Sequence, residues 1–251
     1  ETFKIKEELK SRHELKQSKK AKVRSDKYMA PIGEKKYLAL CEGASAMSGI
    51  SGCVGRQGIG YYACRGLAIN AFNSSIQKIA ANQEFKDIMN ILELDITKDS
   101  SNKTIAFDKV MLTSDADVDG EHVCSMLLGW FARFAPGLFN EGKICRLVTP
   151  LIIIQDAKGH IAKYFLSLQE FKEYEKSGKK IPGKLIYLKG LGSWERSDLQ
   201  YLIDTYGFEN FVFYYKMDEE GKIYLKNWLV DENVDRRKEY IKSFDFDINA
   251  V

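Results

Sequence analysis

Three aspartates alternate with other residues at the end of an apolar run. They are Asp115, Asp117 and Asp119, and the run before them, 109–115, is typical of a buried strand. In an extended segment alternate side chains point to one side, so the three carboxylates can converge. Converging carboxylates repel one another unless a cation lies between them, and hard oxygen ligands suit Mg²⁺ or Ca²⁺ best. The sequence therefore predicts a site for a hard divalent cation.

A fourth carboxylate, Glu42, ends a second predicted strand, 36–41, and a glycine follows it. If the two strands are neighbours in one sheet, all four carboxylates meet at the same edge. Such a site holds one or two Mg²⁺ beside a phosphodiester and stabilises charge on its oxygens. Carboxylates that only cap helices would explain one Asp at a helix start, but not three and a Glu.

Two other chemistries use a similar pattern. Asp-x-Asp-x-Asp-Gly opens the calcium loop of an EF-hand, but that loop needs a bidentate Glu at its twelfth position. Met126 occupies this position, and a strand rather than a helix precedes Asp115, so a calcium loop is disfavoured. A Mg²⁺-dependent phosphohydrolase would use Asp115 as its nucleophile. Lys189 and Thr149 are available to hold a phosphoryl group there, and this alternative stays open.

Composition and charge bound the class of protein. The chain has 251 residues, 45% hydrophobic and 29% charged, which is enough for one large domain or two small ones. Residues 1–36 hold 12 Lys and Arg against 6 Asp and Glu, so the rest carries −3 of a total of +3. A segment of such mixed sign is a solvated helix at least as readily as a nucleic-acid arm.

Five scattered cysteines without a Cys-x-x-Cys pair argue against structural zinc and against a disulfide framework. Reduced thiols and the lack of a transmembrane-length apolar run lead us to expect a cytoplasmic protein without a membrane partner. The chain begins with Glu, so we expect a fragment of a longer protein.

The remaining patterns predict an α/β layer with its ligands at the carboxyl ends of strands. The glycine-rich stretch 44–66 predicts either a loop whose backbone approaches a ligand or a mobile loop. A capping box at Ser167–Glu170 starts a helix that Gly178 ends. We further expect an exposed helix over 3–27, helices over 74–94, 121–134, 194–205 and 233–244, and strands over 143–155, 160–166, 184–188 and 211–216.

Glu42–Ala46 and Asp115–His122 together resemble the metal-binding fold called TOPRIM in type IIA DNA topoisomerases. Four further segments match family motifs in the same order: Arg65–Asn70, Thr149–Leu151, Lys189–Gly192 and Asp235–Ile241. Ordered motifs from about residue 28 to the end are far more specific than one carboxylate motif. The spacing is most similar to the ATPase-bearing large subunit, the B-type subunit, of T-even bacteriophage enzymes. Ala44 and Leu67 depart from the pattern, which has an acidic and a basic residue there.

The resemblance implies a Rossmann-like parallel sheet flanked by helices, with an N-terminal connecting helix in 1–30. A TOPRIM core would span 31–155, and an α+β extension, 156–251, would lead toward a DNA-cleavage domain. Glu42, Asp115 and Asp117 would be catalytic, and with Asp119 they would hold one or two Mg²⁺. The residues implied to contact DNA are Arg65, Asn70, Lys189, Arg236 and Arg237.

The implied activity is that of an ATP-hydrolysing type II topoisomerase, which cuts both strands of one double-stranded DNA, passes another duplex through, and reseals the cut. Its nucleophile would be a tyrosine in a partner subunit or downstream domain, and an upstream domain would bind ATP. The resemblance also implies a two-fold symmetric hetero-oligomer that serves DNA replication, in the host cytoplasm if phage-encoded. The alternative is a non-catalytic DNA-docking module with structural carboxylates. His122 is left out of the ligands.

Overall fold

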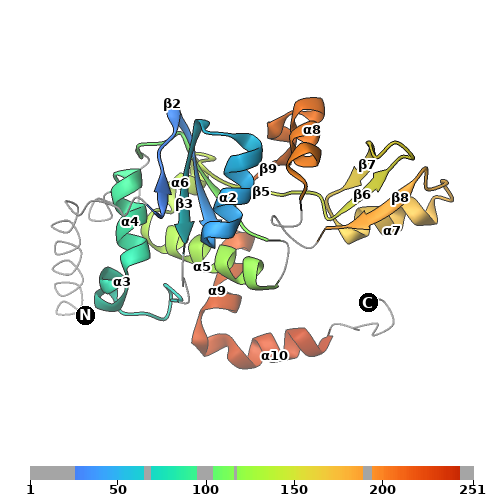
Figure 1. Ribbon diagram of the computed structural model, residues 1–251. Coiled ribbons are helices and arrows are strands. Elements are labelled where there is room, and N and C mark those ends of the chain that lie inside the picture. The colour runs from blue at the N-terminus through green and yellow to red at the C-terminus, as the bar shows by residue number, and fades with distance from the viewer. Residues whose placement is uncertain (1–25, 65–68, 95–103, 116–117, 189–193, 244–251) are drawn as a thin grey trace.

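A six-stranded sheet forms the centre of the molecule (Figure 1). The computed structural model describes residues 26–64, 69–94, 104–115, 118–188 and 194–243. The strand order is β1-β3-β2-β4-β5-β9, and the four inner strands run parallel. Two short antiparallel strands close the sheet at its edges. The strands are β1 (Tyr28–Met29), β2 (Ile32–Glu42), β3 (Gln57–Cys64), β4 (Lys109–Thr113), β5 (Ile144–Leu147) and β9 (Val212–Tyr214).

Helices cover both faces of this sheet, as predicted for an α/β layer. Along β2, Tyr37, Ala39 and Cys41 face one hydrophobic cluster, while Leu38 and Leu40 face the other. This alternation follows from the two-residue period of a strand, and burial on both faces explains the continuous apolar runs. The first face holds α2 (Gly43–Val54) and α8 (Arg196–Tyr206), and the second holds α3 (Ile76–Ala81), α4 (Gln83–Leu92), α5 (Val118–Phe134) and α6 (Gly137–Asn140).

Two smaller parts extend from this core (Figure 1). One is an antiparallel sheet with the strand order β7-β6-β8. Side chains of this sheet and of helix α7 form the third hydrophobic cluster of the molecule. The other, which we call the C-terminal arm, consists of α9 (Glu219–Leu229) and α10 (Val234–Ser243). Across the described ranges no helix combines the length and apolar character that a membrane span requires. The elements of the small sheet are β6 (Ile152–Gln155), β7 (Ile161–Phe165), α7 (Leu168–Lys176) and β8 (Lys184–Tyr187).

The glycine-rich stretch forms regular structure, so the prediction of a loop there was wrong. It contains α2 and β3, with residues 65 and 66 outside the described ranges. Ala46, Met47, Ile50 and Cys53 are buried and recur at helical spacing. A Gly inside a helix costs about 1 kcal/mol relative to Ala, and burial of this apolar face against the sheet offsets that cost.

Other boundaries differ for identifiable reasons. The single strand predicted over 143–155 is two strands in different sheets, interrupted at Pro150, which cannot donate to a ladder. The helix predicted over 74–94 is split at Asn82, which has extended backbone and accepts a hydrogen bond from the Phe85 amide. Most of the helix predicted over 3–27 lies outside the described residues, and Asp26 and Lys27 form a turn.

The predicted N-cap at Ser167 is confirmed, but the carboxylate of Glu170 accepts from the Leu166 amide rather than from that of Ser167, so the capping box is incomplete. The Ser167 hydroxyl accepts a hydrogen bond from the Glu170 amide at 3.2 Å, and α7 begins there. Gly178, at φ 68°, ends the turn after α7, where a side chain would be strained. The aspartate strand and the helix after it are also confirmed as β4 and α5.

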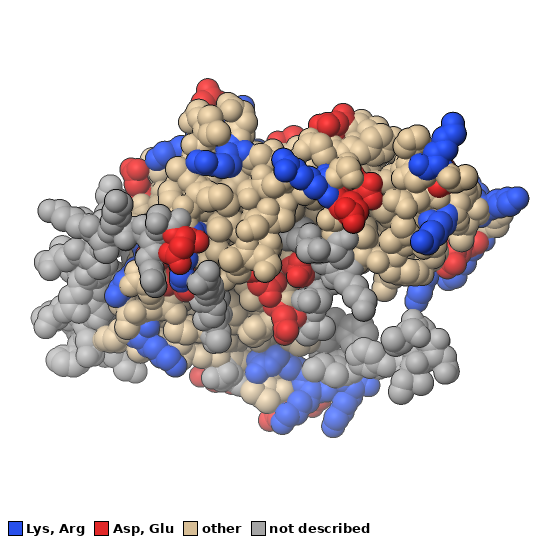
Figure 2. All heavy atoms as spheres, viewed as in Figure 1, with Lys and Arg blue, Asp and Glu red and all other residues tan. Residues whose placement is uncertain are grey.

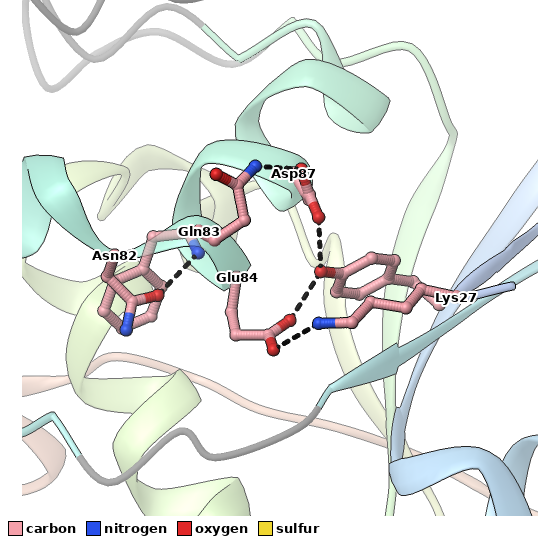
Figure 3. Close-up of polar contacts among 7 residues, drawn as sticks. Lys27, Asn82, Gln83, Glu84 and Asp87 are labelled. Carbon is pink, nitrogen blue, oxygen red and sulfur yellow. Dashed lines mark hydrogen bonds and ion pairs between the residues drawn. The ribbon is translucent and has the colours of Figure 1, made fainter. Parts of the chain in front are cut away.

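A buried polar cluster attaches the start of the described chain to the domain (Figure 3). Lys27 donates to Glu84 at 2.6 Å, and both side chains are about one-tenth exposed. The Tyr62 hydroxyl lies 2.5 Å from the Glu84 carboxylate and 2.9 Å from that of Asp87. Burial, and then these two carboxylates, raise the pKa of the Tyr62 phenol well above its usual range. Lys27 is thus the cation that balances buried negative charge on α4.

We predict that Lys27→Met destabilises the protein by about 3 kcal/mol, because it leaves buried carboxylates without their cation. Urea unfolding followed by circular dichroism measures this. The control is Lys35→Met, which removes an exposed pair to Glu93 at 3.7 Å and should change stability by less than about 0.5 kcal/mol. Equal effects of the two substitutions would contradict the role of the buried cluster.

We also predict that stability falls above pH 9. All five cysteines are free and buried, and burial raises the pKa of Cys145 to about 12 from its ordinary 9.0. Below pH 9 both folded and unfolded thiols keep their proton, so stability is unaffected. Between pH 9 and 12 only the unfolded thiol loses it, which favours unfolding. Urea unfolding at pH 8.5 and 10.5 measures the decline, and Cys145→Val should decline less steeply.

Candidate functional site

The ends of β2 and β4 bring the first and second predicted ligands to one sheet edge. The two strands are parallel neighbours, and Cys41 lies opposite Thr113. Glu42 is the last residue of β2, and Asp115 lies two residues beyond the end of β4. The condition that the two carboxylate strands be neighbours is therefore met. Gly43, at φ 77°, lets the chain turn at once from β2 into α2.

Gly120 lies between Glu42 and the turn at Asp115. The Oε2 atom of Glu42 is buried, and a Cβ atom on Gly120 would lie 3.0 Å from it. The same Cβ would overlap the carbonyl oxygen of Asp115. Position 120 must therefore lack a side chain, because the Glu42 carboxylate and the Asp115 turn both pack against it. This close approach assembles the core of the candidate site.

The other two predicted ligands are not brought into a described cluster. Asp117 lies outside the described residues, and Asp119 is exposed in the first turn of α5. Among the residues that the structure does describe, no group of three His, Cys, Asp or Glu is placed to share a metal ion. The four-carboxylate site thus stays a prediction, with Glu42 and Asp115 as its described part.

An ion pair that sequence reasoning missed clamps the first turn of α5. Arg146, on β5, donates to both carboxylate oxygens of Glu121 at 2.8 and 2.6 Å. A nitrogen of the same guanidinium lies 3.5 Å from the Ser114 hydroxyl. Burial alone would lower the pKa of Arg146, but the hydrogen bonds to Glu121 outweigh it and raise this pKa. The pair holds the start of α5 against β5, beside the carboxylates.

The residues predicted to contact DNA have different surroundings. Arg65 and Lys189 lie outside the described residues. Asn70 donates to the Leu229 carbonyl at 2.5 Å, and Arg237 donates to the Val230 carbonyl at 2.7 Å. Arg236 is exposed on α10, where basic side chains gather in the lower part of Figure 2. As DNA contacts, all five remain predictions, and no spacing in the sequence signals the carbonyl partners of Asn70 and Arg237.

A cavity of about 930 Å³ lies beside the carboxylate edge. Its walls come mainly from α5, the C-terminal arm and the segment 215–218 that leads into the arm. His122, next to the aspartate motif, is exposed and lines this cavity. Apolar and aromatic side chains supply much of the remaining wall, among them Met126, Phe139, Tyr224 and Trp228.

Comparisons with known proteins fit this geometry. Residues 37–148 match the family model described as Toprim domain. DNA topoisomerase 2 from Plasmodium falciparum (isolate K1 / Thailand) is 28% identical over 83% of this chain and 16% of that protein. DNA topoisomerase 2-alpha from Mus musculus is 31% identical over 82% of this chain and 14% of that protein. The chain thus spans less than a fifth of these relatives.

The fold has a counterpart among solved structures. The crystal structure of the Plasmodium falciparum topoisomerase II DNA-binding, cleavage and re-ligation domain matches with a TM-score of 0.77 and 21% identity. The match covers 90% of this chain and 32% of that one, and at this identity it shows the fold alone. Residues 37–148 therefore match a Toprim domain, and over most of its length the chain is similar in sequence to DNA topoisomerase 2.

Proposed function

We propose that this chain supplies the Mg²⁺-binding half of the cleavage and religation site of a type II DNA topoisomerase. The observation that carries the proposal is the assembly of Glu42 and the Asp115 turn around Gly120, at one edge of a Toprim sheet. Homology to DNA topoisomerase 2 supports the reaction class. The substrate would be the phosphodiester of a double-stranded DNA.

The donor set fits Mg²⁺. Carboxylate oxygens are its usual protein ligands, and Gly120 leaves the Glu42 carboxylate room beside the Asp115 turn. We propose Glu42, Asp115, Asp117 and Asp119 as the residues that would hold one or two ions. When bound, Mg²⁺ would stabilise negative charge on the phosphodiester oxygens.

The protein's own residues have three further roles in this proposal. Glu42 can carry a proton to or from the 3′ oxygen, because its Oε2 atom is buried at the site. Arg146 holds Glu121 and thereby fixes the helix that follows the aspartates. Arg65, Lys189 and Arg236 supply positive charge for DNA phosphates. A tyrosine from a partner subunit or downstream domain would lose its phenol proton and attack the phosphorus, which forms a bond from the phenol oxygen to the 5′ phosphate while the bond from phosphorus to the 3′ oxygen breaks. That oxygen leaves and takes up a proton as the 3′ hydroxyl.

We extend the proposal to the whole enzyme. An upstream ATP-binding domain would connect through residues 1–30 to a Toprim core in 31–155, and 156–251 would lead to the cleavage domain. The assembly would be a two-fold symmetric hetero-oligomer that passes one duplex through another in DNA replication. The motif spacing favours a bacteriophage enzyme of the B-type subunit class, acting in the host cytoplasm. Each of these finer assignments rests on the resemblance of motifs.

We predict that Glu42→Gln or Asp115→Asn, in the assembled enzyme, lowers DNA cleavage at least about 100-fold, because each removes charge that holds the metal. Cleaved plasmid is measured on denaturing gels with and without Mg²⁺. The matched control is Asp108→Asn, at the amino end of β4 and exposed, which should cleave like wild type. Full cleavage by either site variant, or cleavage that survives a chelator, would sink the proposal.

We further predict that Gly120→Ala weakens binding of Mg²⁺ or Mn²⁺ at least about tenfold, since the new Cβ displaces the Glu42 carboxylate or the Asp115 turn. Calorimetric titration of the chain with Mn²⁺ measures the affinity. Gly142→Ala is the control for a glycine substitution, because a Cβ there meets nothing within 4 Å, although its φ of 61° adds strain. Unchanged Mn²⁺ affinity in the Gly120 variant would separate this glycine from the metal site.

A further inference from the structure

The C-terminal arm meets the rest of the molecule at the end of α9. The last four carbonyls of a helix have no partner within it. In α9 three of these four accept hydrogen bonds from side chains that lie outside the helix. Asn233 donates to the Lys226 carbonyl at 3.1 Å, Arg237 to that of Asn227 at 3.1 Å, and Asn70 to that of Leu229 at 2.5 Å.

Donors from two other parts of the chain converge on this helix end. Arg237, on α10, also bonds the Val230 carbonyl at 2.7 Å, so one guanidinium nitrogen joins α10 to two carbonyls. Asn73 adds a second bond to the Leu229 carbonyl at 2.9 Å. Asn70 and Asn73 lie in the segment that leads from β3 to α3.

The same segment is tied to α5, the helix that follows the aspartates. Arg133 of α5 donates to the carbonyls of Ala71 and Ser74, the latter at 2.9 Å. Gly129 lets Leu229 approach α5, because a Cβ at Gly129 would lie 2.6 Å from the Leu229 side chain. Hydrogen bonds and one small contact therefore connect the arm to the carboxylate helix.

Elsewhere the arm stands off from α5. The 930 Å³ cavity separates the two, lined by Met126 and Leu128 of α5 and by Tyr224, Leu225 and Trp228 of α9. Residues 215–218 attach the start of α9 to β9, and the bonds at the other end of α9 fix the direction in which the arm continues into α10. The position of α10 relative to the site is therefore set at Asn70, Asn73 and Arg237.

We propose that Arg237, with Asn70 and Asn73, acts as a positioning residue that fixes the orientation of the C-terminal arm relative to α5. Of the two neighbouring arginines on α10, Arg236 is then the one that contacts DNA phosphate. The inference rests on the proposed function, and it revises the role of Arg237 within it. Arg236 is exposed, and its recorded side-chain contact, 3.4 Å to the Asn227 side chain, is at the limit of a hydrogen bond. Arg237 is partly buried, and its guanidinium donates hydrogen bonds to backbone carbonyls.

Lysine substitutions separate the two roles. Lysine keeps the charge and still pairs with phosphate, but it lacks the planar fork that reaches two carbonyls at once. Arg236→Lys should therefore leave the hydrogen bonds at the end of α9 intact, because Arg236 donates to none of these carbonyls. Arg237→Lys should keep the charge but lose the paired hydrogen bonds to the carbonyls of Asn227 and Val230.

The deciding measurement is amide hydrogen exchange of the full chain, read by mass spectrometry over residues 219–233. We expect exchange in Arg237→Lys to be about tenfold faster than in wild type, because charged hydrogen bonds to the helix end are lost. Asn73→Ala should accelerate the same segment to a smaller extent. Arg236→Lys is the matched control and should exchange like wild type. Wild-type exchange in Arg237→Lys would overturn the proposal.

Binding to a 30-base-pair DNA duplex supplies the second readout, in the full chain and without added metal. We expect Arg237→Lys to weaken it about threefold or more, whereas Arg236→Ala reduces the slope of log affinity against log salt by about one. Faster exchange with unchanged affinity in Arg237→Lys would overturn the link between the arm and DNA. If the wild-type chain binds no DNA, the proposed function fails. The exchange comparison still decides whether Arg237 holds the end of α9.

Discussion

The parallel pairing of β2 with β4 is the constraint on which the rest of the structure depends. It places Glu42 and Asp115 at one edge of the sheet, although they are far apart in the sequence. Parallel strands need crossovers, so the chain between them covers the faces of the sheet with α2, α3 and α4, while β3 adds a strand on the other side of β2. The two hydrophobic clusters follow from that need, since each face of the sheet is covered.

Two features shape the edge of the sheet that carries the candidate site: the missing side chain of Gly120 and the ion pair between Arg146 and Glu121. Gly120 permits the Glu42 carboxylate and the Asp115 turn to share one volume. Arg146 pairs with Glu121 and so holds the first turn of α5, the helix that follows the aspartates.

The strand and helix that flank the aspartates could be predicted from the sequence because their signals are local. The apolar run, the alternating aspartates and the glycine after them occupy one short segment, and β4 and α5 formed as predicted. The stretch 44–66 could not be predicted in the same way, because burial against the sheet overrides the low helix propensity of glycine. Nor could the bonds of Asn70 and Asn73 to the Leu229 carbonyl, which join positions more than 150 residues apart.

The attachment of Lys27 has a mechanical consequence. β1 contributes only Tyr28 and Met29 to the sheet, so a two-residue ladder and one buried ion pair hold the start of the described chain. A tension applied from the residues before Lys27 would meet the Lys27–Glu84 pair first and pass into α4 (Figure 3). The edge strand and α4 would bear that load, whereas β2 and β4 lie further inside the sheet. Such a load would enter the sheet on the far side of β3 from the two strands that carry Glu42 and lead to Asp115.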